Sequence, residues 1–130
     1  MLRGSRRRVV PLAGACALAV VLSGTPAPAA IDMYVGARTV VQNQPVSSCS
    51  LKAKTALNAV LQDAVEAGET NQWQAYGPPD SSGHASAGAA IHCYPLDNGY
   101  VVTFTCAVET PPNTGSASDL CAKLTTAFGS

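Results

Sequence analysis

The stretch AAIHCYPLDNGYVVTFTC, residues 89–106, contains the pattern that decides the fold of this chain. Two mostly apolar runs, the second rich in β-branched and aromatic residues, flank the turn sequence LDNG, which predicts a β-hairpin with strands over 89–96 and 100–108. Successive side chains of a strand point to opposite faces, so every second residue shares one face. The residues expected on the core face of the second strand are Val102, Phe104, Cys106 and Val108.

The length of the turn decides which side chains of the first strand join that face. A turn of two or four residues places Ile91 and Cys93 on the core face. The same turn leaves His92 and Tyr94 on the opposite, wetter face, beside the threonines of the second strand. A three-residue turn would instead bury His92. Because burial of Ile91 is favourable, we expect an even-numbered turn.

This hairpin register also restricts how the cysteines pair. Four cysteines follow the N-terminal leader described below, at positions 49, 93, 106 and 121. Under either even turn the residue opposite Cys93 is Val102 or Phe104. A bond between Cys93 and Cys106 is therefore unfavourable, because a disulfide needs Cα atoms roughly 5.5 Å apart.

Each hairpin cysteine is then expected to reach a helix. We prefer Cys106–Cys121 with Cys49–Cys93, because the shorter loop closes more readily. The crossed alternative, which joins 49 to 106 and 93 to 121, stays open. In either case the disulfides attach two helices to the inner face of a small sheet.

Two helices are expected, one before the hairpin and one after it. The first begins near Cys49, with Ser47 and Ser48 as capping residues, and ends at Gly68. Its apolar residues recur at helical spacing: Ala53, Leu57, Val60, Leu61 and Ala64. The second helix spans 116–128.

The remaining segments complete the sheet. Residues 33–41 and 72–76 are typical of strands, and residues 77–88, rich in Pro, Gly and Ser, are typical of a loop. The order of elements is β-α-(β)-β-β-α. The sequence therefore predicts an α+β fold, a small and mainly antiparallel sheet with two helices on one face and two disulfides.

The N-terminus has the features of a secretory signal peptide. Four arginines precede a mostly apolar run over 9–22, and Ala27-Pro28-Ala29 supplies the small-x-small pattern read by signal peptidase. The apolar run is shorter than a membrane span. We expect residues 1–29 to be removed and residues 30–130 to form one secreted domain. The Ser-Arg-Arg-Arg motif at 5–8 leaves a twin-arginine export route open.

Removal of the leader changes the charge of the chain. Four Lys and Arg residues remain against eight Asp and Glu residues, so the domain has a formal net charge of −4. So few cations disfavour nucleic acid or an anionic membrane as partner, and we expect no membrane insertion. No closely spaced pair such as C-x-x-C indicates a zinc site, and we expect neither a metal nor another cofactor.

The last third of the chain resembles part of the Streptomyces subtilisin inhibitor family. In that family a strand ends in a Thr-x-Thr-Cys-like run, and a helix carries a second cysteine fifteen residues on. Residues 103–106 match the strand and residues 121–124 match the helix at that spacing. The resemblance implies a secreted inhibitor of subtilisin-type serine proteases. Val108 replaces a family proline, and the reactive-site loop, which follows the helix in the family, is not found before Ser130, so no inhibitory residue is carried over.

The sequence shows no constellation typical of catalysis, and we expect a protein that is not an enzyme. His84 and His92 are the only histidines, and neither has a partner at a spacing typical of a general base. The serines near His84 lie in a loop that would not preorganise a catalytic triad.

The segment best suited to contact a partner surrounds the Pro- and Gly-rich loop, because aromatic side chains beside such a loop can anchor a protein ligand. Trp73 can also pack beneath the loop as part of the core, and both interpretations stay open. The candidate binding residues are Trp73, Tyr76, Pro78, Pro79, His84, His92 and Tyr94. The expected function is that of a secreted binding module whose partner is another extracellular protein, a protease or an envelope component.

Overall fold

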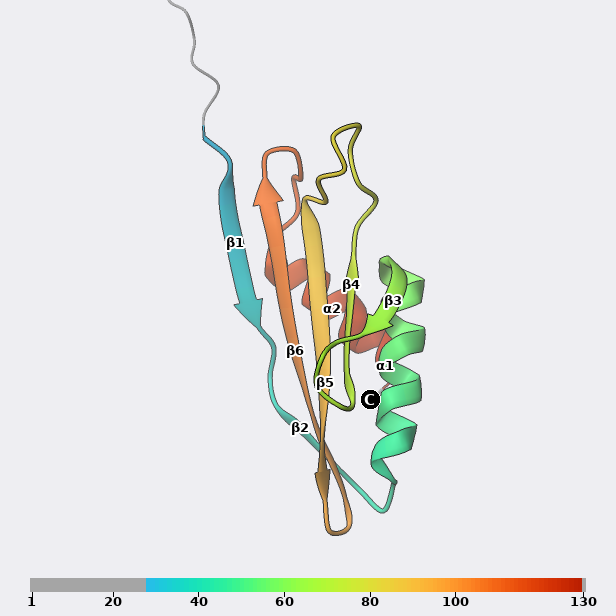
Figure 1. Cartoon of the computed structure of the whole chain (residues 1–130). Coiled ribbons are helices and arrows are strands. Elements are labelled where there is room, and N and C mark those ends of the chain that lie inside the picture. The colour runs from blue at the N-terminus through green and yellow to red at the C-terminus, as the bar shows by residue number, and fades with distance from the viewer. Residues whose placement is uncertain (1–27, 130) are drawn as a thin grey trace, which may run out of the picture.

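The computed structural model describes residues 28–129, so the expected leader over 1–29 lies outside the described residues except for its last two positions. Antiparallel strands form one sheet in the order β1-β6-β5-β4-β3, and β2 pairs with the first part of β6. The elements are β1 (Ala30–Val35), β2 (Thr39–Gln42), α1 (Val46–Val60), β3 (Gln62–Glu66), β4 (Gln72–Tyr76), β5 (Ala87–Leu96), β6 (Gly99–Thr110) and α2 (Ala117–Phe128). Both helices cover the same face of the sheet (Figure 1). The expected α+β fold is thereby confirmed.

The β5–β6 hairpin forms the centre of the sheet. Its turn has two residues between the paired Leu96 and Gly99, which confirms the even-numbered turn. This register places Ile91 opposite Phe104, and both side chains are buried beneath the helices. Glycine is required at position 99, because its φ is +139° and a Cβ there would come within 2.1 Å of the Val41 carbonyl oxygen.

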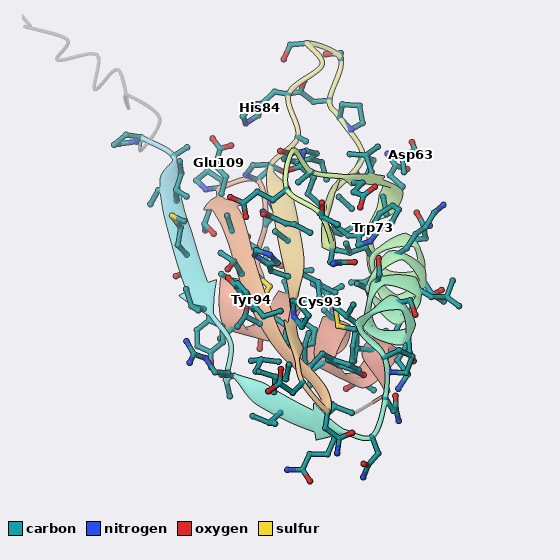
Figure 2. The ribbon with its side chains drawn as sticks, turned by 60° about the horizontal axis from the view of Figure 1, so that its bottom comes forward. Asp63, Trp73, His84, Cys93, Tyr94 and Glu109 are labelled. Atoms are coloured by element: carbon teal, nitrogen blue, oxygen red, sulfur yellow. A yellow bond between two sulfur atoms is a disulfide. The ribbon has the colours of Figure 1, made fainter. Side chains whose placement is uncertain are left out.

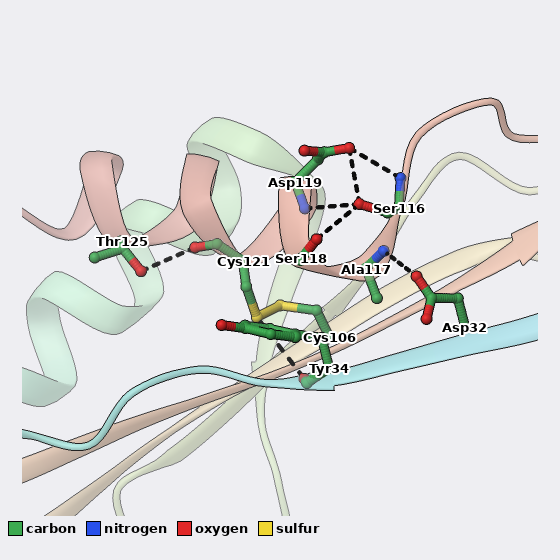
Figure 3. Close-up of a disulfide and its surroundings, with 9 residues drawn as sticks. All are labelled: Asp32, Tyr34, Cys106, Ser116, Ala117, Ser118, Asp119, Cys121 and Thr125. Atoms are coloured by element: carbon green, nitrogen blue, oxygen red, sulfur yellow. Dashed lines mark hydrogen bonds between the residues drawn. A yellow bond between two sulfur atoms is a disulfide. The ribbon is translucent and has the colours of Figure 1, made fainter.

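Two disulfides connect the hairpin to the helices. Cys49 of α1 bonds Cys93 of β5, with Cα atoms 6.0 Å apart. Cys106 of β6 bonds Cys121 of α2, with Cα atoms 5.8 Å apart (Figure 3). The preferred pairing is confirmed and the crossed alternative is wrong. All four cysteines are buried, so the disulfides form part of the core between sheet and helices.

The rest of the core is apolar and lies between the sheet and the two helices. Its largest fully buried side chains besides cysteine are Tyr100, Phe104, Leu57, Ile91, Leu124 and Val102. Phe104 of β6 meets Phe128 of α2 edge to face, with ring centroids 5.6 Å apart. Burial raises the pKa of the Tyr100 phenol, whose hydroxyl has no hydrogen-bond partner among the described residues.

Helix α1 is shorter than its apolar pattern predicts. It ends at Val60, and the expected end at Gly68 was wrong. Residues 62–66 instead form β3, which pairs with β4. The side chain of Asn58 accepts a hydrogen bond from the Ala64 amide at 2.9 Å and supports the change of direction. Residues 62–66 form a strand and do not extend the helix, because a strand here forms hydrogen bonds with backbone N–H and C=O groups of β4 that would otherwise have no partner.

Two other expectations for the N-terminal half were also wrong. Pro45 is the N-cap of α1 and no side chain caps this end, so Ser47 and Ser48 do not have the predicted role. The helix begins earlier because the Ser48 amide already donates to the Pro45 carbonyl. The single strand expected over 33–41 is two strands, because one extra residue between β1 and β2 shifts their register on β6.

The first turn of α2 is held from two sides. Ser116 accepts a hydrogen bond from the Asp119 amide, and the Asp119 carboxylate accepts one from the Ser116 amide, which completes a capping box. Hydrogen bonds from Ser116 lower the pKa of Asp119. From the sheet, the carboxylate of Asp32 in β1 accepts a hydrogen bond from the Ala117 amide at 2.8 Å (Figure 3). Strand β1 is thereby connected to α2.

Candidate functional site

The sheet face opposite the helices is covered by no helix or strand of residues 28–129, and we call it the open face. The pairing of β5 with β6 places His92 and Tyr94 on this face, together with Thr103 and Thr105. This confirms the alternation predicted for the hairpin. The residues in the middle of the open face are small, among them Gly88, Ala90 and Ala107.

Tyr76, the last residue of β4, is the most prominent side chain at the loop end of the open face. Its ring is 55% exposed and lies over Gly88, where a Cβ would come within 2.9 Å of the ring. Tyr76 lines a cleft of about 460 Å³, together with Gln62, Asp63, Gly77, Pro79, Gly83, His84 and Ala85. It also lines a hollow of about 170 Å³, whose other lining residues include Ile31, Gly88 and Ala107. We call the cleft and the hollow together the Tyr76 groove.

The loop over residues 77–86 forms the roof of the cleft and has its own hydrogen bonds. One carboxylate oxygen of Asp80 accepts hydrogen bonds from the Ser82 amide at 2.8 Å, the Ser82 hydroxyl at 2.6 Å and the His84 amide at 3.1 Å. The hydrogen bonds from Ser82 and His84 lower the pKa of Asp80. At the end of the loop, the side-chain amide of Asn113 donates to the Ser86 carbonyl at 2.9 Å. The loop therefore has a defined shape although it is exposed.

A histidine–carboxylate pair attaches this loop to the sheet. Nε2 of His84 pairs with Oε2 of Glu109, near the end of β6, and Figure 2 shows the two side chains side by side. The hydrogen bond and the charge of Glu109 raise the pKa of His84, and the charge of Asp80 adds to this effect. Among residues 28–129 no Lys or Arg lines the cleft, whereas Asp63 does. The groove is therefore rimmed by acidic groups.

Replacement of Glu109 by Gln is expected to return the pKa of His84 toward its ordinary value of about 6.5. In the unchanged protein that pKa is raised, so the pair stabilises the loop at acidic pH and this contribution is lost as the pH rises through the raised pKa. An NMR titration of the His84 ring measures the shift directly. Glu66→Gln, which removes a carboxylate of β3, is the control and should leave the titration unchanged.

The structure brings some of the predicted binding residues together and separates others. Tyr76, Pro79 and His84 line the same cleft, and Pro78 is an exposed neighbour in the same loop. His92 and Tyr94 of β5 also lie on the open face, but neither lines the cleft or the hollow. Their rings stack with centroids 3.9 Å apart. The stack and the groove are two separate parts of one face.

Trp73 does not lie with these residues. Its indole nitrogen donates to the Ser50 hydroxyl of α1 at 2.6 Å, and the Lys54 ammonium group lies 5.2 Å from the ring centre. Its partner in β5 is Ile91, which points into the core. The structure therefore favours the interpretation in which Trp73 is part of the core, but it packs against α1 and not beneath the loop.

The sequence did not point to three residues of the groove. Gln62 and Asp63 fell within the expected helix, so their place beside the loop could not be foreseen. Asp63 has a positive φ of 53°, as expected for a residue at an irregular point of β3. Glu109 lies 25 residues from His84, and only the hairpin register brings them together.

Chemical alternatives for this surface are few within residues 28–129. No group of three or more His, Cys, Asp or Glu side chains there could hold a metal ion. In the same range no helix has the length and apolar character needed to cross a membrane. Neither a family model nor a curated protein matches this chain.

Proposed function

We propose that this chain is a secreted, non-enzymatic binding module that contacts another extracellular protein through the Tyr76 groove. Two disulfides in a domain of this size are typical of proteins that fold in an oxidising compartment, and they support the expected export. The expected leader supports the same conclusion from the sequence.

The observation that carries the proposal is the position of Tyr76. A tyrosine ring offers a large contact area and loses few rotamers on binding, which is why such rings often anchor protein interfaces. Here the ring lines both a cleft that Asp63 and Gln62 also line and an apolar hollow, and both are open to solvent. The loop that covers the cleft is held by Asp80 and by the pair of His84 with Glu109, so little ordering remains for the partner to induce.

The chemistry of the groove indicates the kind of segment it binds. The hollow suits a small apolar side chain, since its lining is mostly Ala, Gly and Ile carbon. The cleft has Asp63 and Gln62 on its wall, and Glu109 lies beside the hollow. Because the domain is acidic overall, a neutral or basic peptide segment of the partner is favoured over an acidic one.

Tyr76→Ala is expected to weaken capture of the partner at least about tenfold, because the central anchor is lost while the core is unchanged. The immobilised secreted protein is exposed to culture supernatant and to cell-wall fractions, and the bound protein is identified and titrated. Tyr94→Ala is the matched control, since Tyr94 is also an exposed tyrosine of the open face, 44% exposed, but lies outside the groove. Equal capture by the wild type and by Tyr76→Ala would contradict the proposal.

A second candidate function is inhibition of a serine protease. It is supported by the resemblance of the Cys106–Cys121 unit to the Streptomyces subtilisin inhibitor family and by the preformed loop over 77–86, which is exposed as a protease-binding loop must be. Titration against subtilisin-like and trypsin-like proteases separates the two functions. Inhibition at micromolar protein concentration would support the inhibitor, and its absence would leave the binding module.

A further inference from the structure

The two edges of the sheet differ in how well they are protected against pairing with another strand. The β3 edge is short, has a register irregularity between Gln62 and Val65, and carries Asp63 and Glu66. Short length, irregularity and charge are the features by which natural edge strands avoid association. Strand β1 has regular pairing along its whole length, contains neither Lys nor Pro, and is exposed at every residue.

The backbone of β1 offers hydrogen-bonding groups on its outer side. The amide of Gly36, just after β1, donates to the Phe104 carbonyl of β6 at 2.8 Å. Alternate residues of an antiparallel strand bond to the same neighbour, so the even-numbered residues of β1 face β6. The outward N–H and C=O groups therefore belong to Ile31, Met33 and Val35. No other strand of residues 28–129 pairs with them.

The side chains of the same three residues make this edge apolar. Ile31, Met33 and Val35 lie on the open face and are among the most exposed large apolar residues of the chain. The one charged residue of β1, Asp32, points to the other face and is engaged by the amide of Ala117. No charged side chain of β1 therefore lies on the open face beside Ile31, Met33 and Val35.

We propose that β1 pairs antiparallel with β1 of a second copy of this chain, around a twofold axis at Met33. Met33 then lies opposite Met33 of the second copy, and Ile31 lies opposite Val35. The three pairs of this register are Ile31 with Val35, Met33 with Met33, and Val35 with Ile31. In each pair the backbone N–H and C=O groups of both residues point away from β6 and toward the second copy, so each pair exchanges two hydrogen bonds. The two sheets become one continuous sheet. This inference is independent of the Tyr76 groove and of its partner.

The charge of Asp32 disfavours one neighbouring register. The proposed register places Asp32 opposite Tyr34 of the second copy, whereas a shift that moves the twofold axis to Asp32 sets two carboxylates opposite each other, which is destabilising. The antiparallel direction also brings the Arg38 end of one copy toward the Glu109 end of the other. The edge is therefore complementary to itself in hydrogen bonding, in apolar contact and in charge.

The size of the contact sets the expected affinity. A single pair of six-residue strands buries less than the roughly 1,000 Å² typical of stable interfaces. We therefore expect a reversible dimer with a dissociation constant on the order of micromolar to tens of micromolar, which the net negative charge of the domain weakens further at low salt.

Sedimentation equilibrium of the secreted protein, with both disulfides intact, tests the proposal between about 1 µM and 1 mM, a range that brackets the expected affinity. The wild type is expected to pass from monomer to dimer. Met33→Lys is expected to weaken association at least about tenfold, because it sets two ammonium groups against each other at the axis. Leu51→Lys is the matched control, since Leu51 on α1 and Met33 are both 68% exposed, and it should still dimerise.

A second variant keeps the test decisive if Met33→Lys disturbs the fold. Met33→Pro removes an outward N–H and the exposed methionine side chain but no hydrogen bond to β6, a change that edge strands tolerate. It should abolish the dimer while the melting temperature of the monomer stays close to that of the wild type. Amide exchange at Ile31, Met33 and Val35 should slow as the concentration rises. The proposal is overturned if the wild type stays monomeric to 1 mM, or if Thr105→Lys on the open face disrupts the dimer and the Met33 variants do not.

Discussion

Replacing Cys106 and Cys121 together by alanine is expected to lower the free energy of unfolding by about 3 kcal/mol. A disulfide restricts the unfolded chain, and the restriction grows with the number of residues in the closed loop. This disulfide closes a loop with a sequence separation of 15, and the Cys49–Cys93 disulfide closes one of 44. Removal of the second disulfide is therefore expected to cost about 4 kcal/mol.

Urea unfolding, followed by near-UV and far-UV circular dichroism, measures both effects. Thr105→Ala, on the open face of the same strand as Cys106, is the control and should change the free energy of unfolding by less than about 0.5 kcal/mol. A loss below about 1 kcal/mol in both double variants would contradict the view that the disulfides hold the helices against the sheet.

Phe104→Ala is expected to lower the free energy of unfolding by about 3–5 kcal/mol, the range typical of a buried phenylalanine replaced by alanine. The side chain is only 2% exposed and lies at the centre of β6, where it meets Phe128 of α2 edge to face. Removing the ring leaves a cavity between sheet and helix. The two disulfides hold both layers in place, so the cavity cannot close by a shift of α2.

Tyr100→Phe in the same core provides the comparison. It removes a buried hydroxyl that has no hydrogen-bond partner among the described residues, so the free energy of unfolding should stay the same or rise. Chemical denaturation of both variants at one pH gives the two differences. A destabilisation of less than about 1 kcal/mol by Phe104→Ala would show that the core is not packed as described.

The hairpin and the disulfides were predictable because two independent constraints agreed there. The alternation of apolar residues in 100–108 gave the buried face, and burial of Ile91 chose an even turn. That register moved Cys93 away from Cys106, after which loop length favoured the observed pairing. Local pattern and global fold are consistent over this stretch, which is why sequence reasoning succeeded.

The end of α1 was not predictable from the same kind of pattern. Val60, Leu61 and Ala64 continue the helical spacing and all three pack against the core, but two of them do so from beyond the helix. Periodicity reports burial and does not say which backbone conformation achieves it. The decisive factor was the pairing of β3 with β4, a tertiary contact that no local pattern records.

For the candidate site, the sequence predicted several of the residues but not how they come together in space. Aromatic and loop residues of the groove were named from the sequence, but Glu109 reaches His84 only through the hairpin register, and Asp63 reaches the cleft only through β3. Trp73, by contrast, was named from the sequence but does not lie in the groove. Its character left a surface anchor and a place in the core both open, and its position on the inner face of β4, with Ser50 as partner, favours the core.

The central claim is that two helices are held on the inner face of one antiparallel sheet by bonds from Cys49 to Cys93 and from Cys106 to Cys121. Peptide mapping of the protein without reduction tests this most directly. The expected result is one linked fragment containing residues 49 and 93, one containing 106 and 121, and no free thiol among these four cysteines. A fragment that joins 93 to 106, or four free thiols in a protein that still melts cooperatively, would contradict it.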